Sequence, residues 1–278
     1  EVRSEGQLLD RAFEGGLNAT QFQTMDLNGD GELDMVLYHR MAQEITTYLA
    51  IDGTYEWAPE YALAFPDDVV HWLILKDYDC DGKKDLFTST PLGIKVYRNI
   101  SSGNLPEWEE AAPFLTINSG SNIQVSPGDI PGIADINGDG ALDILTYRFG
   151  STSTIVYYEN TGSCGDLNFD RITRNWGFFE ECNCNSFVFD EPCPVGNIAF
   201  DSNAIQHAGG KTILPFDADG DGDIDIITSD ELCENLYFLR NEGTSQEARM
   251  LNFSLYPNEK PVQFSFFPSS FLEDIDFD

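Results

Sequence analysis

The chain has 278 residues, of which 48 are acidic and 15 are Lys or Arg, giving a formal net charge of −33. Such a charge is repelled by nucleic-acid phosphates, so nucleic acid is excluded as a partner. No stretch approaches the roughly 20 apolar residues of a membrane span. The polar start, Glu1 to Glu5, does not resemble a signal peptide, which predicts that the numbering begins on a mature or trimmed product.

The pattern D-x-[DN]-x-D-G-x-x-D occurs at 26–34, 77–85, 135–143 and 217–225. Positions 1, 3, 5 and 9 supply carboxylate or amide oxygens, and position 7 would supply its backbone carbonyl, a set that suits the six to eight oxygen ligands of calcium. Position 6 is glycine, which adopts a positive φ at little cost. The predicted metal positions are Asp26, Asn28, Asp30, Glu32, Asp34, Asp77, Asp79, Asp81, Lys83, Asp85, Asp135, Asn137, Asp139, Ala141, Asp143, Asp217, Asp219, Asp221, Asp223 and Asp225.

A fifth copy of the pattern begins with Asp274, Asp276 and Asp278, where the printed sequence ends. These three residues are further candidate ligands, and we expect four or five calcium ions in the chain. Asn28 and Asn137 replace Asp at position 3, which lowers the charge of those two sites by one. The first and third loops are therefore expected to bind calcium more weakly than the second and fourth.

The residues after each loop distinguish among calcium-binding motifs. An EF-hand needs a bidentate Glu at position 12, but this position holds Leu37, Thr88, Thr146 and Thr228. Position 9 is instead followed by an apolar, β-prone run, which predicts a strand. These runs are 35–38, 86–88, 144–147 and 226–228. Each loop is thus expected to join two strands, with its last ligand on the second.

Two further β-prone elements follow in each unit. The first comprises 45–51, 94–99, 155–160 and 236–241, and aromatic stretches at Trp108, 169–172 and 253–256 come next. The simplest count is four strands per unit. The units recur at intervals of about 50 to 60 residues, with one longer interval before Asp217, and this is the period of propeller blades.

A calcium loop between two strands, followed by an aromatic strand that ends in Asn, resembles the FG-GAP/VCBS repeat of calcium-bearing β-propellers, which include integrin α-subunit heads. The likeness covers nearly the whole chain. The Phe-Gly and Gly-Ala-Pro landmarks are not clear, so it is similar to the bacterial type of repeat. The resemblance implies an extracellular propeller with one calcium in the first hairpin loop of each blade, used for adhesion or ligand binding.

The predicted fold class is therefore all-β, a single β-propeller of four-stranded blades over 1–278, with its fifth repeat cut at 274–278. Because closed propellers have about 4 to 8 blades, we expect more blades after residue 278. The alternative is a self-closing ring of four blades.

Six cysteines, an even number, predict a disulfide framework whose fifteen possible pairings the sequence leaves open. Cys164, Cys182, Cys184 and Cys193 lie in a Cys-rich insertion at 163–210, and Cys80, at position 4 of the second loop, is available to another segment. A zinc site is the alternative, but Cys182 and Cys184 lack the usual spacing. Disulfides and calcium loops together predict a secreted or cell-surface protein.

The leading functional prediction is a non-catalytic binding or adhesion module in which calcium is structural. Its partner is expected to be a protein or carbohydrate at the cell surface. One alternative is a carbohydrate-active enzyme such as a polysaccharide lyase, although basic residues are sparse and no catalytic motif is present; paired carboxylates for glycoside hydrolysis are too numerous to single out. Another is a passenger segment of a larger exported surface protein, handled by surface export machinery as cargo.

Overall fold

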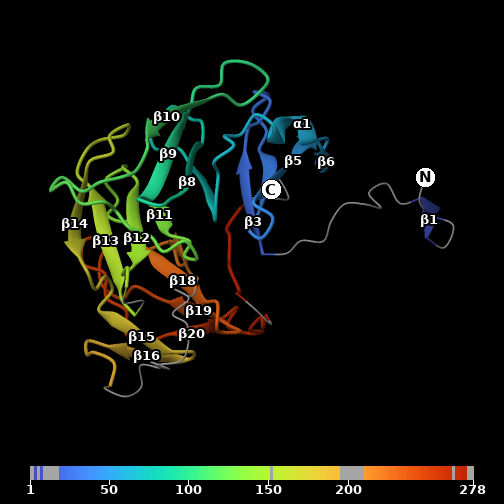
Figure 1. Ribbon diagram of the computed structural model, residues 1–278. Coiled ribbons are helices and arrows are strands. Elements are labelled where there is room, and N and C mark those ends of the chain that lie inside the picture. Colours follow the sequence, from blue (N-terminus) through green and yellow to red (C-terminus); the bar gives the residue numbers. More distant parts are fainter. Residues whose placement is uncertain are drawn as a thin grey trace.

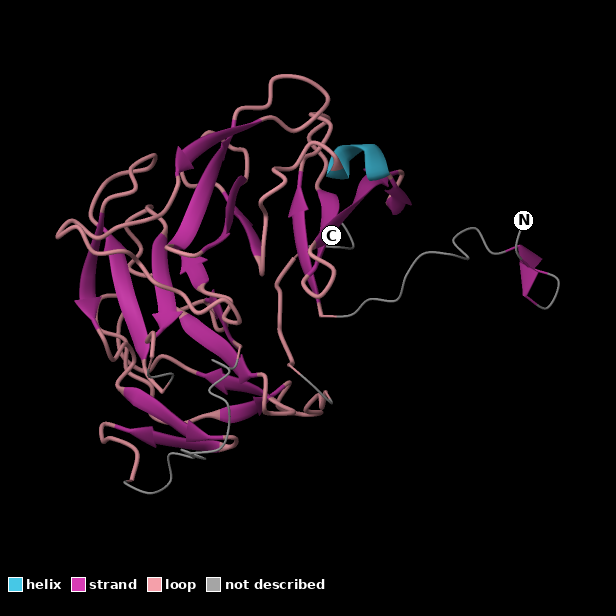
Figure 2. Cartoon of the chain, viewed as in Figure 1, coloured by secondary structure: helices cyan, strands magenta, loops and turns pink. Residues whose placement is uncertain are grey.

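The computed structural model describes residues 3–4, 7–8, 19–150, 153–194, 210–264 and 267–273. The described residues form strands almost throughout, with one short helix, α1 (Pro59–Ala62), as Figure 2 shows. None of their helices is long and apolar enough to cross a membrane. The all-β prediction is confirmed.

Four antiparallel sheets of four strands are arranged as a four-bladed β-propeller (Figure 1). Blade 1 contains β3 (Thr20–Met25), β4 (Asp34–His39), β5 (Glu44–Ile51) and β6 (Thr54–Trp57). Blade 2 contains β7 (Leu73–Lys76), β8 (Asp85–Thr90), β9 (Gly93–Asn99) and β10 (Trp108–Ala112). Blade 3 contains β11 (Gly132–Ala134), β12 (Asp143–Tyr147), β13 (Ile155–Asn160) and β14 (Phe169–Thr173). Blade 4 contains β17 (Lys211–Phe216), β18 (Asp225–Asp230), β19 (Leu236–Leu239) and β20 (Ser254–Tyr256).

The remaining strands form two hairpins. In the first, β1 (Arg3–Ser4) pairs with β2 (Gln7–Leu8). In the second, β15 (Phe179–Asn183) pairs with β16 (Ser186–Phe189) inside the Cys-rich insertion. Of that insertion, 195–209 lies outside the described residues.

The hydrophobic cores lie between successive blades. Successive side chains of a strand point to opposite faces of its sheet, so neighbouring residues enter different cores. Leu86 packs in the core shared by blades 1 and 2, whereas Phe87 packs in the core shared by blades 2 and 3. Likewise, Ile144 faces blade 2 and Leu145 faces blade 4. This two-sided burial explains why the second strands are apolar runs rather than alternating sequences.

The first strands of neighbouring blades are also joined by polar contacts. The Gln21 side chain donates from Nε2 to the Leu73 carbonyl at 3.1 Å and accepts the Leu73 N–H at 2.9 Å. Between blades 3 and 4 a parallel bridge connects Ile130 with Thr212. These contacts pair buried polar groups of the central strands.

Residues 267–273 run alongside these first strands. Phe267 and Phe271 pack against the core of blades 2 and 3, and Glu273 accepts hydrogen bonds from Thr24 and, at 3.3 Å, from Lys84. The segment, red in Figure 1, thereby extends toward β3. The candidate ligands Asp274, Asp276 and Asp278 follow it but lie outside the described residues.

All six cysteines form disulfides, which decides against the zinc alternative. The pairs are Cys80–Cys164, Cys182–Cys193 and Cys184–Cys233. Two of them fasten the hairpin of β15 and β16. Cys182–Cys193 closes within the insertion, and Cys184–Cys233 connects the hairpin to the turn after β18. As predicted, Cys80 pairs with another segment, and that segment is the turn between β13 and β14 of the next blade.

Candidate metal loops

Each predicted calcium loop connects the first and second strands of one blade, and position 9 is the first residue of the second strand in all four. We call them loop 1 (26–34), loop 2 (77–85), loop 3 (135–143) and loop 4 (217–225). The prediction that each loop joins two strands and places its last candidate ligand on the second strand is confirmed.

The loops share a local hydrogen-bond pattern. The position 6 glycines have φ between +87° and +92°, and each donates its N–H to the position 1 carboxylate. The position 7 N–H donates to the position 5 carboxylate in every loop. These bonds curl the backbone around the side chains of positions 1, 3 and 5. Aspartate at positions 1 and 5 therefore shapes the loop as well as offering oxygens to a metal.

Position 9 has a second role that the sequence reading missed. Asp85 is fully buried, and its two oxygens accept the N–H of Tyr78, in its own loop, at 2.9 Å and of Asn99, on the third strand, at 2.8 Å. Asp34, Asp143 and Asp225 bind the equivalent two N–H groups. This carboxylate therefore fastens the loop to the third strand of its blade or, in blade 4, to Asn241 just after that strand.

Burial of these carboxylates has an electrostatic consequence. Desolvation raises the pKa of Asp85 and of Asp143 to about 6, against the lowering effect of the backbone N–H donors. The pKa values of Asp34 and Asp225 are raised for the same reason. A buried carboxylate of this kind gains from a nearby cation, which favours its charged form.

Loops 2 and 4 bring three carboxylates together. Oxygens of Asp77, Asp79 and Asp85 lie within 4.8 Å of one another, and so do those of Asp217, Asp219 and Asp225. In loop 2 the Asp77 Oδ1 atom is buried and accepts no hydrogen bond from the described residues. Converging oxygens with one left unpaired fit a hard cation such as calcium, which Asp77, Asp79, Asp81 and Asp85 would hold.

Loops 1 and 3 differ at position 3. There the Asn28 and Asn137 amides donate to the position 5 carboxylates, Asp30 and Asp139, at 2.8 Å and 3.0 Å. In loops 2 and 4, position 3 is Asp79 or Asp219, and each contacts an arginine. Arg98 Nε lies 2.5 Å from Asp79 Oδ2, and Arg240 Nη2 lies 2.8 Å from Asp219 Oδ2. The extra carboxylate is thus accompanied by an arginine on the third strand (Arg98) or directly after it (Arg240), which the sequence reading also missed.

The side chain at position 7 varies, as predicted. In loop 2, Lys83 Nζ donates to the Ser101 carbonyl at 2.8 Å and lies 3.8 Å from Asp81 Oδ2. The carbonyls of Glu32, Lys83, Ala141 and Asp223 remain predicted ligands. Beside loop 1 there is an open groove of about 460 Å³, lined by Asp30 and Glu32 and by the turn between β5 and β6.

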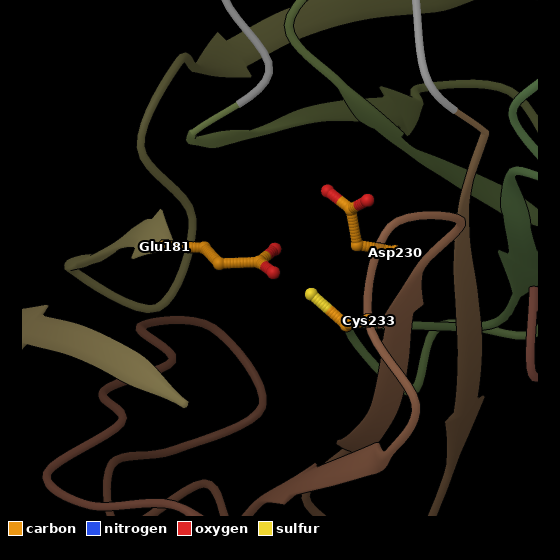
Figure 3. A group of neighbouring side chains, drawn as sticks. All are labelled: Glu181, Asp230 and Cys233. Carbon is orange, nitrogen blue, oxygen red and sulfur yellow. The ribbon is translucent and has the colours of Figure 1, made fainter. Parts of the chain in front are cut away.

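A second acidic cluster lies between β15 of the Cys-rich insertion and the end of β18, where Glu181, Asp230 and Cys233 face one another (Figure 3). It is not a metal site. The Cys233 sulfur is bonded to Cys184, and Lys211 Nζ lies 2.6 Å from Glu181 and 2.8 Å from Asp230. Burial alone would lower the pKa of Lys211, but the two carboxylates raise it, so the amine stays protonated and supplies the cation itself.

Comparisons with known proteins agree with this repeat structure. The FG-GAP-like repeat matches residues 26–88 and 77–146, two overlapping segments that each begin at position 1 of a loop. A search of curated proteins found no match.

The matches among solved structures include the following two. An Agrocybe aegerita lectin, described as recognising non-reducing terminal N-acetylglucosamine, is 16% identical with a TM-score of 0.41; the match covers 86% of this chain and 66% of the lectin. The Photorhabdus luminescens Tc holotoxin pore with the TccC3 D651A mutation is 18% identical with a TM-score of 0.43, over 91% of this chain and 10% of that one.

The blades and their loops define a β-propeller of four-stranded blades with an acidic loop in the first hairpin of each. The chain is a four-bladed β-propeller that carries FG-GAP-like repeats over residues 26–146.

Proposed function

We propose that this protein is a secreted or cell-surface binding module whose blade hairpins are held by structural calcium. The converging carboxylates of loops 2 and 4 and the unpaired Asp77 oxygen support the calcium part. The three disulfides support an oxidising compartment. Extracellular calcium modules bind with dissociation constants of about 0.1 to 1 mM, so the ion outside a cell would fill such sites.

The observation that carries the binding role lies on the opposite face. In each blade the turn between the second and third strands is at the other end of the second strand from the calcium loop. Each of these turns displays one large apolar side chain: Met41 is 73% exposed, Leu92 47%, Phe149 56% and Leu232 78%. One exposed apolar residue is ordinary, but a repeat of it in four blades favours an interaction face.

The chemistry of this face favours a protein partner. Apolar side chains gain by leaving water when they enter the surface of another protein. Phe149 is flanked by Arg148, whereas the Arg40 guanidinium beside Met41 is turned inward and donates to the carbonyls of His71 and Gly128. The calcium-loop face, by contrast, carries the Asp clusters. We therefore place the partner on the face away from the loops and assign no catalytic role.

Site-specific photocrosslinking tests this placement. A photoreactive residue at Leu92 or Phe149 should give a crosslinked protein of defined mass with intact cells of the producing organism. Excess unlabelled protein should suppress that product. The same residue at Asp223, on the calcium-loop face, is the matched control and should give none. Crosslinks from the control position alone would contradict the proposal. In a separate assay, release of unsaturated uronate from acidic polysaccharides would identify the protein as a polysaccharide lyase instead.

A further inference from the structure

Position 4 of the calcium loops is glycine in three cases and cysteine in one. Gly29, Gly138 and Gly220 have φ values of +78°, +78° and +79°, and Cys80 has +58°. A residue with a β-carbon is unfavourable in this left-handed region. The backbone at Cys80 nevertheless has a positive φ, as in the other three loops. Cys80 forms a disulfide with Cys164, which lies 84 positions further along the chain.

The disulfide reinforces a contact that recurs between blades. In loops 1 to 3, the turn between the third and fourth strands of the next blade covers the calcium loop. A β-carbon on Gly29 would lie 3.3 Å from the Gly103 carbonyl oxygen of blade 2. Gln246 of blade 4 donates to the Asn137 carbonyl in loop 3 at 3.2 Å. We call these segments the covering turns.

Over loop 2 the covering turn is the segment around Cys164 in blade 3. Gly165 donates its N–H to the Tyr78 carbonyl at 2.9 Å. It also lies against Asp79, because a β-carbon added to Gly165 would be 3.7 Å from the Asp79 β-carbon. Within the described residues, no hydrogen bond joins loop 4 to another blade. The Asp79 side chain is accordingly 7% exposed, whereas that of Asp219 is 29% exposed.

Loops 2 and 4 share four of their five candidate ligand residues. Both have aspartate at positions 1, 3, 5 and 9, and both place an arginine beside position 3. The local charge differs, however: Arg98 lies closer to Asp79 than Arg240 lies to Asp219, and Lys83 at position 7 lies 3.8 Å from Asp81 Oδ2 where loop 4 has Asp223. These cations oppose calcium in loop 2, and what favours loop 2 is the covering turn and the covalent bond to it. Reduced exposure strengthens the attraction between cation and carboxylates, and a loop already held in its binding shape loses less freedom when the ion binds.

We propose that the Cys80–Cys164 disulfide holds loop 2 in its ion-binding shape and makes it the tightest of the four calcium sites. This inference rests on the proposed calcium function. Cys80 and Cys164 are positioning residues, since they contact no ion. The affinity of loop 2 should exceed that of loop 4 by about tenfold.

The test is a calorimetric calcium titration of a Cys80→Gly/Cys164→Ser variant. Glycine at position 80 restores the residue that the other three loops use, so the variant removes the bond while the loop backbone stays favourable. The tightest binding step should weaken by about tenfold. Cys182→Ser/Cys193→Ser is the matched control, because it removes a disulfide that touches no calcium loop, and its tightest step should be unchanged. An unchanged tightest step in the Cys80→Gly/Cys164→Ser variant would overturn the proposal.

A second pair of variants keeps every disulfide and so does not depend on the folding of the first. Asp79→Asn should weaken the tightest step, because Asn at this position removes one carboxylate as in loops 1 and 3, whereas Asp219→Asn should leave that step unchanged. The reverse result overturns the proposal, because loop 4 would then be the tightest site. Absence of all calcium binding in the unaltered protein has a different meaning: the proposed calcium function itself would fail.

Discussion

Loop 2 and loop 4 have aspartate at the same four positions but different surroundings, and they differ at position 7, which is Lys83 in loop 2 and Asp223 in loop 4. In loop 2, a turn of the next blade lies over Asp79 and is bonded to Cys80. In loop 4, positions 1 to 6 are exposed. The comparison teaches that the ligand pattern alone does not set the properties of a site in a propeller. The neighbouring blade contributes the cover, and in loop 2 it contributes a covalent bond as well.

The largest effect is expected away from both loops. Lys211→Met should lower the free energy of unfolding by about 3 to 5 kcal/mol, because Glu181 and Asp230 would remain buried without their cation. Chemical denaturation measures this loss. The calcium-binding steps of loops 2 and 4 should not change, since the cluster is not a metal site. A lost calcium step in this variant would show that the cluster binds metal after all.

Another buried carboxylate, that of Asp129, makes the stability of the fold depend on pH, and so affects any comparison of loops 2 and 4. Desolvation raises the pKa of Asp129 to about 7, and its Oδ2 atom accepts no hydrogen bond among the described residues. Between about pH 4 and pH 7 the folded state holds a proton that the unfolded state has released, so stability should fall as the pH rises through this window.

Asp129→Asn removes that titration. The variant should be more stable than the unaltered protein at pH 8, by on the order of 2 to 4 kcal/mol, and should lose this advantage at pH 4. Denaturant unfolding at several pH values measures the difference. An advantage of equal size at both pH values would show that Asp129 is not the titrating group. In the Asp129→Asn variant, loops 2 and 4 can be compared near neutral pH without a contribution from the titration of Asp129.

Position 9 offers a third comparison. Asp85→Asn and Asp225→Asn should each cost about 1 to 3 kcal/mol in calcium-free buffer, because each leaves a buried backbone N–H without its acceptor. The two costs should be similar, since both carboxylates accept the same two N–H groups. In saturating calcium, Asp85→Asn should lose more stability than Asp225→Asn. Equal losses with calcium would break the distinction between the loops.

The smallest effect is expected in loop 1. Asn28→Asp adds a carboxylate and should raise the calcium affinity of that loop several-fold, while slightly lowering calcium-free stability by repulsion from Asp26 and Asp30. The third strand of blade 1 has Leu49, which packs against the core, where that of blade 2 has Arg98, so no arginine offsets this repulsion in loop 1. Isothermal titration and thermal unfolding measure the two effects. A weakened loop 1 would mean that charge count does not govern affinity.

Much of the architecture could be predicted because the repeat is local in sequence. Asp34, Asp85, Asp143 and Asp225 were expected to begin the second strands, and they do. Four strands per unit were likewise expected and found. The same local pattern placed each loop in the first hairpin of its blade.

The surroundings of the loops could not be predicted, since they depend on how blades pack. Nothing in the residues near Asp79 indicates that Gly165 lies over it, and six cysteines allow fifteen pairings. One signal was available and was not used: Cys80 stands at a position that is glycine in the other three loops. Similarly, Arg98 and Arg240 precede Asn99 and Asn241 only in blades whose loops have Asp at position 3.

The most direct test of the account is metal analysis after dialysis against calcium, combined with thermal unfolding before and after chelation. Four filled loops predict about four bound ions per chain and a melting temperature that falls when calcium is removed, because an ion that binds the folded state stabilises it. Clearly fewer than about three ions, or a melting temperature that chelation leaves unchanged, would contradict the claim that these loops are structural calcium sites.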